Sequence, residues 1–252
     1  MPQLALYVFG APRLDRDGLP VRVQRRKVMA LLVYLAVTGE SHTRETLAAL
    51  FWPDENQSHA RAALRRTLSE LNKILGVKVA KTGTDSLSLA GCADFWLDAG
   101  EFHRRLVNSY THLHPSNQPC SECFTSLTEA ARLYRADFLT GFTLSDSVGF
   151  DEWQCLETES LRRELIGVLK HLASIHQARR EADQAILAAR RWLSLDPTDE
   201  AAHQLLMRLY AASGQRSAAL RQYQECAHIL GFEFGIPPLE ETTQLYECIC
   251  SQ

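Results

Sequence analysis

The chain has 252 residues, 46% of them hydrophobic and 23% charged, and a formal net charge of −3. This length allows two or three small domains, each with a core of its own. No apolar run approaches the roughly 20 residues that a membrane-spanning helix requires, and the apolar start at residues 4–9 is too short for a secretion signal. Seven cysteines, an odd number, fit reduced thiols better than a disulfide framework. These features predict a cytoplasmic protein.

Charge is distributed unevenly along the chain. Residues 1–97 hold thirteen Lys and Arg against nine Asp and Glu, a net charge of +4, and the remainder holds fourteen against twenty-one, a net charge of −7. A basic front joined to an acidic rear is typical of a nucleic-acid-binding domain followed by a protein-binding one.

The front half of the chain opens with strand patterns and continues with helical ones. Short β-type runs at 4–9, 13–16 and 21–23 surround the turn Asp17-Gly18, which is a strong hairpin signal. A helix is predicted over 26–37, ended by Gly39. A second helix is predicted over 44–51, with Thr43 as its N-cap and Pro53 after its end.

A third helix is predicted from Gln57 to Leu75. Its apolar residues recur at helical spacing and form the face that a helix buries: Ala60, Leu64, Leu68, Leu71 and Leu75. The opposite arc carries Arg61, Ala62, Arg65, Arg66, Ser69, Asn72 and Lys73, and Glu70 lies off it. Taken alone, such an arc is more often a solvated helix face than a DNA-binding one. The order of the surrounding elements favours DNA binding.

Two further β-type runs follow Gly76, at 77–79 and 87–89, around a predicted turn at 81–85. Strands, three helices and a terminal hairpin are the order of a winged helix-turn-helix, whose third helix enters the major groove. We therefore predict an α+β DNA-binding domain over 1–97. The rest of the chain, 98–252, is predicted to be an all-α domain, so the fold class is mainly α.

Each polar residue of this front domain is assigned an expected contact. Arg61, Arg65 and Arg66 can each present a bidentate fork to guanine, with Ser69 beside them. Asn72 is expected to hydrogen-bond to adenine or, because it lies late on the helix, to contact phosphate alone. Backbone contacts are expected from Thr43, Arg44, Lys73, Lys81 and Thr84. The basic run at 25–27 is expected to be a solvated helix start or to make contacts within the protein.

The rear domain repeats itself at an offset of 34 residues. The segment from Leu172 to Ile186 matches the segment from Leu206 to Leu220 in its apolar, turn and small residues. A helix–turn–helix period of 34 is typical of tetratricopeptide (TPR) arrays. A generic antiparallel bundle is the alternative. Other helices are predicted at 99–109, 124–138, 150–178 and 239–250.

A polar loop in the rear domain holds four metal-ligand residue types within twelve positions. His112 and His114 are followed by Cys120 and Cys123, a set that can close a tetrahedral structural zinc site. A reduced, metal-free loop is the alternative. No cofactor is expected to be required for function. On helical faces, Cys155, Cys226, Cys248 and Cys250 are expected to be small core or surface residues.

Over nearly its whole length the chain resembles the Streptomyces antibiotic regulatory proteins (SARPs). Residues 25–32, 47–53 and 60–76 are similar to their OmpR-type DNA-binding domain, and residues 133–142, 213–226 and 235–240 to their bacterial transcriptional activator domain. The resemblance implies an activator that binds promoter repeats, self-associates on DNA and touches RNA polymerase. Glu70 and Asn72 stand where relatives frequently have arginine, so a base preference cannot be transferred. The chain is either a complete small member or the front of a longer protein.

Two other classes of function compete with this interpretation. The first is a TPR-type scaffold whose front domain binds protein without binding DNA. The second is an enzyme, which is not expected because the sequence contains no phosphate-binding Gly-rich loop, nucleophile elbow or paired carboxylates placed around a cleft.

Overall fold

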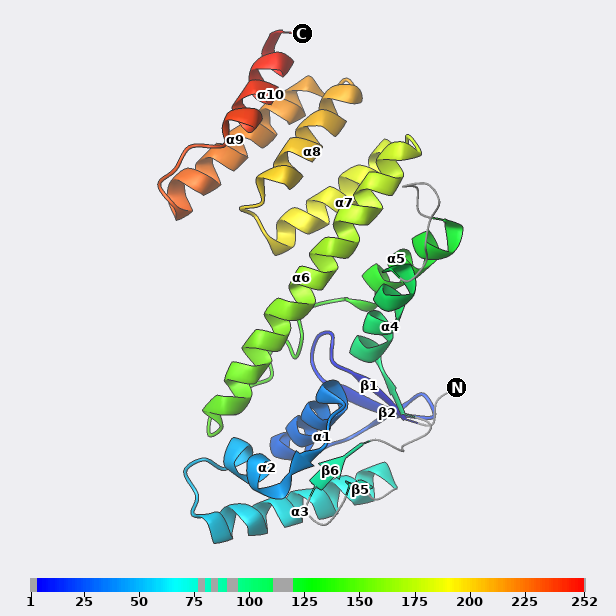
Figure 1. Ribbon diagram of the computed structural model, residues 1–252, viewed down its shortest axis with the longest axis vertical. Helices are drawn as coiled ribbons and strands as arrows, with labels where there is room; N and C mark the ends of the chain where they lie inside the picture. The colour runs from blue at the N-terminus through cyan, green and yellow to red at the C-terminus, as the bar shows by residue number, and fades with distance from the viewer. Residues whose placement is uncertain (1–3, 77–79, 83–85, 90–94, 111–119, 252) are drawn as a thin grey trace. The chain divides into compact units, whose positions relative to one another are not determined.

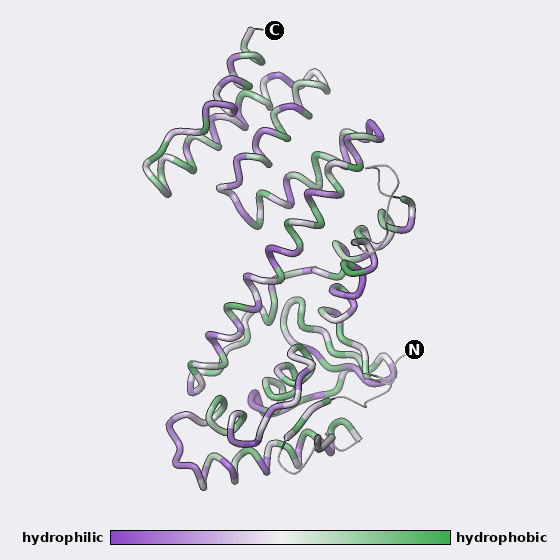
Figure 2. The backbone as a smooth tube through the Cα atoms, in the orientation of Figure 1, coloured by the Kyte–Doolittle hydropathy of each residue, from purple (hydrophilic) through white to green (hydrophobic). Residues whose placement is uncertain are grey.

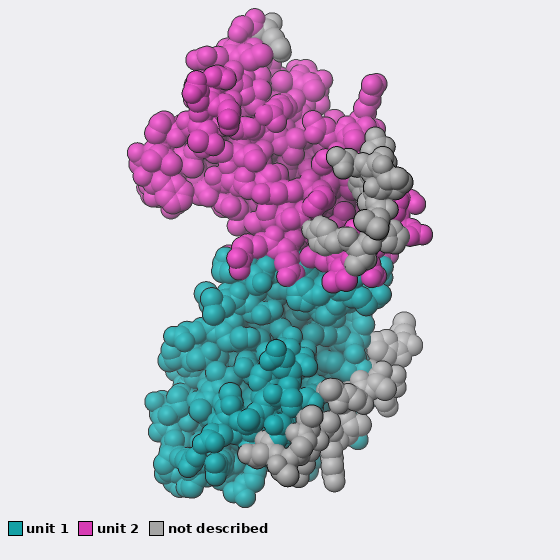
Figure 3. All heavy atoms as spheres, viewed as in Figure 1, with its two compact units in different colours: residues 1–105, 132–161 teal, residues 106–131, 162–252 magenta. Residues whose placement is uncertain are grey.

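The computed structural model describes residues 4–76, 80–82, 86–89, 95–110 and 120–251 (Figure 1). The chain forms two compact units: the first holds residues 1–105 and 132–161, and the second holds 106–131 and 162–252 (Figure 3). Strands lie in the first unit and helical repeats in the second, as the predicted fold class requires. No helix in the described ranges is long and apolar enough to cross a membrane.

A four-stranded sheet in the order β3-β2-β1-β7 opens the first unit. Its strands are β1 (Leu4–Tyr7), β2 (Arg13–Arg16), β3 (Leu19–Val21) and β7 (Phe95–Leu97). The predicted hairpin turn between β2 and β3 is confirmed, because Asp17 and Gly18 both have positive φ, at 50° and 81°. Strand β7 was not predicted; it pairs with β1 in parallel.

Three helices follow in the order that a winged helix-turn-helix requires: α1 (Arg26–Thr38), α2 (Arg44–Phe51) and α3 (Gln57–Leu75). Helix α1 ends at Gly39, whose φ of 64° is the left-handed C-cap expected from the sequence. A second sheet in the order β4-β6-β5 joins β4 (His42–Thr43), β5 (Ala80–Thr82) and β6 (Ser86–Ser88). The predicted strand at 77–79 lies outside the described residues. Lys81, predicted in a turn, lies in β5.

Residues 132–161 belong to the first unit because their aromatic side chains fill its core. Phe150 packs against Phe51 with ring centroids 5.5 Å apart, and Trp153 packs against Tyr34 at 4.8 Å. Phe138 bridges to Phe9, with backbone hydrogen bonds on either side. The helix predicted at 124–138 is therefore wrong at both ends. Helix α5 covers Ser121–Leu133, and Phe138 beyond it pairs with Phe9, just after β1, instead of remaining helical.

The two compact units do not divide at the predicted domain boundary. That boundary was placed between Leu97 and Asp98, at the junction of β7 and helix α4 (Asp98–Tyr110). Instead, residues 132–161 join the strands and first three helices, and helix α6 (Val148–Ala178) begins in one unit and continues in the other. The predicted front domain thus shares its core with a segment from the predicted rear domain.

The second unit contains the predicted 34-residue repeat. The turn after α6 and the turn after α8 (Glu200–Ala212) have equivalent left-handed residues, Arg180 with φ 61° and Gly214 with φ 72°. Their backbone hydrogen bonds repeat at the same offset: Glu181 N–H donates to His176 O at 2.9 Å, and Gln215 N–H donates to Tyr210 O at 2.8 Å. The repeat is confirmed.

Helices α7 (Ala182–Leu195), α8, α9 (Arg216–Glu233) and α10 (Glu240–Ser251) bury a continuous apolar core. Small residues such as Ala185 and Ala219 occupy equivalent core positions of the two repeats. The hydropathy colouring shows hydrophobic and hydrophilic residues alternating along these helices (Figure 2). Each helix pair therefore buries one side against the next, as in a TPR-like array.

Candidate nucleic-acid interface

Helix α3 has the boundaries predicted from the sequence, and one side of it belongs to the core. Asn56 caps its first turn by accepting from His59 N–H at 3.0 Å, and Gly76 ends it with φ 69°. The predicted apolar stripe is buried, and Thr67 joins it, with its hydroxyl donating to Ala63 O. A helix held along one side presents the other side as a rigid surface.

The predicted reading residues lie on that outer side. Arg61, Arg65, Ser69 and Lys73 are exposed and follow one another at intervals of four residues, so they form a single row along α3. Asn72 is half-buried beside the end of this row. Asn72 and the four residues at intervals of four are together called the α3 row. The α3 row thus places three cations, a hydroxyl and an amide on the side of α3 that faces away from the core.

An acidic residue from another helix approaches the row, a contact that the pattern of α3 does not reveal. Glu45 of α2 lies 3.9 Å from the Arg61 guanidinium and accepts a hydrogen bond from Gln57 at 2.8 Å. Both charged side chains are more than half exposed, Arg61 at 52% and Glu45 at 64%. Water screens such a pair, so it is easily exchanged for a phosphate or a base. The helical wheel of α3 alone could not show it.

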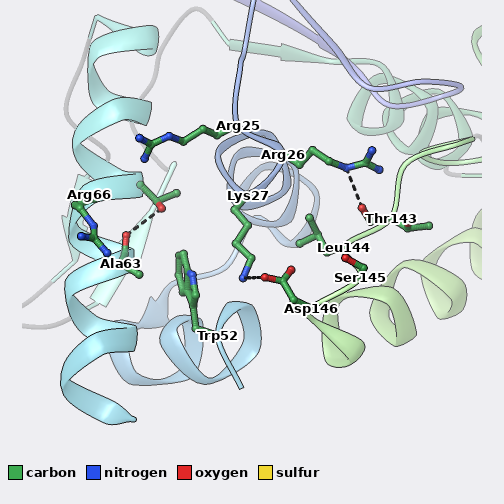
Figure 4. A pocket seen from close by; sticks show the side chains of 11 residues that line it. Arg25, Arg26, Lys27, Trp52, Ala63, Arg66, Thr143, Leu144, Ser145 and Asp146 are labelled. Atoms are coloured by element: carbon green, nitrogen blue, oxygen red, sulfur yellow. Dashed lines mark hydrogen bonds and ion pairs between the residues drawn. The ribbon is translucent and has the colours of Figure 1, made fainter. Parts of the chain in front are cut away.

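Arg66 is exposed and lies on α3 outside the α3 row (Figure 4). There it lines a cavity with the basic run at 25–27. Those three residues make contacts within the protein, as one of the two predicted alternatives stated. Arg25 pairs with Glu70 at 3.3 Å, Arg26 donates to Thr143 O at 3.0 Å, and Lys27 pairs with Asp146 at 2.8 Å.

The start of α2 offers two of the predicted backbone contacts. Thr43 is exposed and caps the helix by accepting from Thr46 N–H at 3.0 Å. Arg44 follows it and is half-buried. The exposed end of a helix dipole beside a cation is suited to a DNA phosphate.

Replacing Thr43 with alanine removes the cap and should lower the free energy of unfolding by about 1 kcal/mol. The measurement is urea denaturation followed by circular dichroism. Thr46→Ala is the matched control, because the Thr46 backbone N–H remains to be capped when its hydroxyl is lost. An equal loss in both variants would show that the Thr43 side chain contributes nothing specific as a cap.

The predicted hairpin contacts are only partly described. Lys81 lies in β5, the strand that pairs with β6, and Thr84 lies outside the described residues. Their assignment to phosphate remains a prediction.

The predicted zinc site is also split. Cys123 is buried, with its thiol 3.5 Å from Ser109 O, and Cys120 is half-buried three positions earlier. His112 and His114 lie outside the described residues, so the four ligands cannot be placed together. Elsewhere in the described ranges no group of three or more His, Cys, Asp or Glu side chains could hold a metal ion. The zinc site therefore stays a prediction.

Among the other cysteines, Cys226 of α9 is a core residue, as one predicted alternative stated. Burial, with Glu200 and Glu225 nearby, raises its pKa to about 12. It is therefore a neutral thiol at physiological pH. Cys155, Cys248 and Cys250 are exposed.

Comparison with known proteins identifies the family. Residues 97–250 match the family model described as the bacterial transcriptional activator domain. Over 262 aligned positions the chain is 26% identical to the regulatory protein AfsR of Streptomyces coelicolor, an alignment that covers 98% of this chain and 24% of AfsR. The chain thus spans about a quarter of the length of that curated relative.

A solved structure shares the fold. EmbR of Mycobacterium tuberculosis, determined in complex with a low-affinity phosphopeptide, superimposes with a TM-score of 0.72 at 21% identity, covering 99% of this chain and 65% of the EmbR chain. The chain therefore belongs to the bacterial transcriptional activator domain family and is a transcriptional regulator of the Streptomyces antibiotic regulatory protein type.

Proposed function

We propose that this regulator binds duplex promoter DNA through the α3 row and Arg66, and so acts in the cytoplasm on bacterial promoters. The observation that carries the proposal is that Arg61, Arg65 and Lys73 are exposed in one line on a helix whose opposite side is core. The exposed cap of α2 supplies a phosphate contact next to that helix.

In this proposal, cations supply affinity and the arginine forks supply base selection. Arg61 and Arg65 reach base edges, and Lys73 and Arg44 meet the backbone. Ser69 and Asn72 complete the surface with neutral hydrogen-bonding groups. Glu45 leaves Arg61 when DNA arrives, at small cost because the pair is exposed.

Selecting bound sequences from random duplex DNA tests this proposal most directly, because one experiment reports binding, base preference and half-site spacing. We expect enrichment of a repeated element, since protomers that self-associate on DNA occupy repeats. Recovery of unselected sequence would contradict the proposal. It would favour the alternative of a helical-repeat scaffold that binds protein alone.

Salt dependence separates the two functions quantitatively. With Arg44, Lys73 and Lys81 on phosphates, the slope of log K against log salt concentration should be about −2.7 per protomer, and affinity should fall about 40-fold between 50 and 200 mM salt. Fluorescence anisotropy of a labelled promoter duplex measures this slope. Lys73→Gln should reduce its magnitude by about 0.9. A slope near zero would rule out phosphate binding.

We further propose that the helical repeats recruit RNA polymerase once the promoter is bound. The family match covers these helices and names a transcriptional activator. An in vitro transcription assay with purified polymerase tests this step. Activation should require helices α7 to α10 together with an intact α3 row, and activation by a chain that cannot bind DNA would contradict the proposal that promoter binding comes first.

A further inference from the structure

A cavity of about 670 Å³ lies in the first unit, between α3, the start of α1 and the segment leading into α6 (Figure 4). Four cationic side chains line it, Arg25, Arg26, Lys27 and Arg66, against the single carboxylate of Asp146. It is separate from the α3 row, with which it shares no residue. Arg66 alone belongs both to this cavity and to the proposed DNA-binding surface.

Arg25 pairs with Glu70, whereas Arg26 and Lys27 are held in place by neutral or exchangeable partners. Arg26 donates to a backbone carbonyl, Thr143 O, and stacks 4.8 Å above the Phe142 ring, so its charge is fixed without being neutralised. Lys27 donates to Phe51 O at 2.6 Å and pairs with Asp146, a side chain that is 63% exposed. An incoming anion can replace that carboxylate.

The start of α1 adds backbone donors to these side chains. Its N-cap, Arg25, makes no side-chain cap hydrogen bond, and its first turn contains no acidic residue. Val28 N–H already donates to Arg25 O at 3.0 Å, so the first-turn N–H groups before it and the positive end of the helix dipole face the basic run without an acidic residue in that turn. Helix starts of this kind bind phosphate groups.

The other walls of the cavity are partly apolar. The half-buried indole of Trp52 lies 4.9 Å from Lys27 Nζ, and buried Leu144 faces the same space. A volume of about 670 Å³ falls within the range of sites that hold drug-sized ligands. It is more than a single phosphate needs.

We propose that this cavity binds a small molecule that carries a polyphosphate and an aromatic group, the chemistry of a nucleoside triphosphate. The polyphosphate lies between Arg26, Lys27 and Arg66 at the start of α1. The aromatic group lies along the wall formed by Trp52 and Leu144. This binding site goes beyond the proposed function, and it requires no DNA.

Isothermal titration calorimetry of the full chain with ATP, in the absence of divalent cations and DNA, tests the proposal. We expect saturable binding with a Kd below 1 mM. Arg26→Gln should weaken ATP binding at least tenfold, and Ser145→Glu, which adds a carboxylate to an exposed position on the rim, should do the same. Arg22→Gln is the matched control, because this exposed arginine is close in the chain but does not line the cavity.

Two further titrations test the two parts of the ligand. Adenosine should bind far more weakly than ATP, since it lacks the polyphosphate, and pyrophosphate should bind more weakly because it leaves the apolar wall unused. The proposal is overturned by no saturable heat with ATP, by equal ATP binding in Arg26→Gln and the unsubstituted chain, or by adenosine or pyrophosphate binding as tightly as ATP. If Arg26→Gln weakens DNA binding but not ATP binding, the cavity instead takes a DNA backbone phosphate. That result would also overturn the proposal.

Discussion

Arg65→Ala and Arg66→Ala should each abolish detectable promoter binding while leaving the chain folded. Both side chains are exposed, and in the described part of the chain neither makes an ion pair or hydrogen bond that folding would lose. A bidentate hydrogen bond from an arginine to a base contributes roughly 1–3 kcal/mol of discrimination against the wrong base. Loss of the arginine charge also weakens the attraction to the DNA phosphates. Gel-shift titration at protein concentrations near the unsubstituted Kd measures the effect.

The control for these variants is Arg208→Ala, which removes an exposed arginine from α8 in the other compact unit. It should leave promoter binding unchanged, and all three variants should unfold at the same urea concentration as the unsubstituted chain. Unchanged affinity in both α3 variants would remove this helix from DNA reading. Loss in Arg65→Ala alone would assign Arg66 to the cavity rather than to the groove.

The features that the sequence predicted correctly are those encoded locally. Helix α3 has its predicted bounds because Asn56, the apolar stripe and Gly76 each act within a few residues. Thr43 caps α2 for the same reason. The TPR-like repeat could be recognised because its two copies place similar residues at equal spacing, including the turn positions 180 and 214.

The features that the sequence did not reveal depend on contacts between distant segments. Strand β7 is three residues long and pairs in parallel with β1, about 90 positions earlier, so no local alternation or turn announces it. The predicted end of α5 is wrong because residues 134–138 look helical, but Phe138 pairs with Phe9. The same contacts place 132–161 in the first compact unit.

The candidate interface shows the same division. Helical periodicity correctly predicted that the basic residues of the outer arc of α3 would be exposed, since burial of one side fixes the other, but Ala62 and Asn72 of the same arc are half-buried. It could not show that Glu45 approaches Arg61 from α2, nor that Arg66 lines a cavity together with residues at the start of α1. Both depend on how neighbouring helices pack, and both change what each arginine is expected to do.

Asp98 joins the start of α4 to the segment just after β1, 90 positions earlier in the chain. Its side chain is fully buried at the junction of β7 and α4, and its carboxylate accepts from Val8 N–H at 2.9 Å and from Phe9 N–H at 3.1 Å. Ala99 N–H donates to the same group at 2.9 Å. Burial raises the pKa of Asp98, although these three donors and nearby Arg135 lower it. Asp98 therefore stabilises the junction mainly by accepting these hydrogen bonds, and less by its negative charge.

Asp98→Ala should consequently lower the free energy of unfolding by about 3 kcal/mol, because it leaves buried N–H groups at the end of β1 without partners. Asp98→Asn should lower the free energy of unfolding by less. The Asn side-chain oxygen still accepts from Val8 N–H, and only the oxygen that accepts from Phe9 N–H is replaced by an NH₂ group, which cannot accept. Urea denaturation monitored by tryptophan fluorescence measures both. Equal losses in the two variants would mean that the negative charge itself stabilises the junction. A loss below 0.5 kcal/mol in Asp98→Ala would mean that water satisfies the freed donors, and that the join between β1 and the start of α4 does not depend on this side chain.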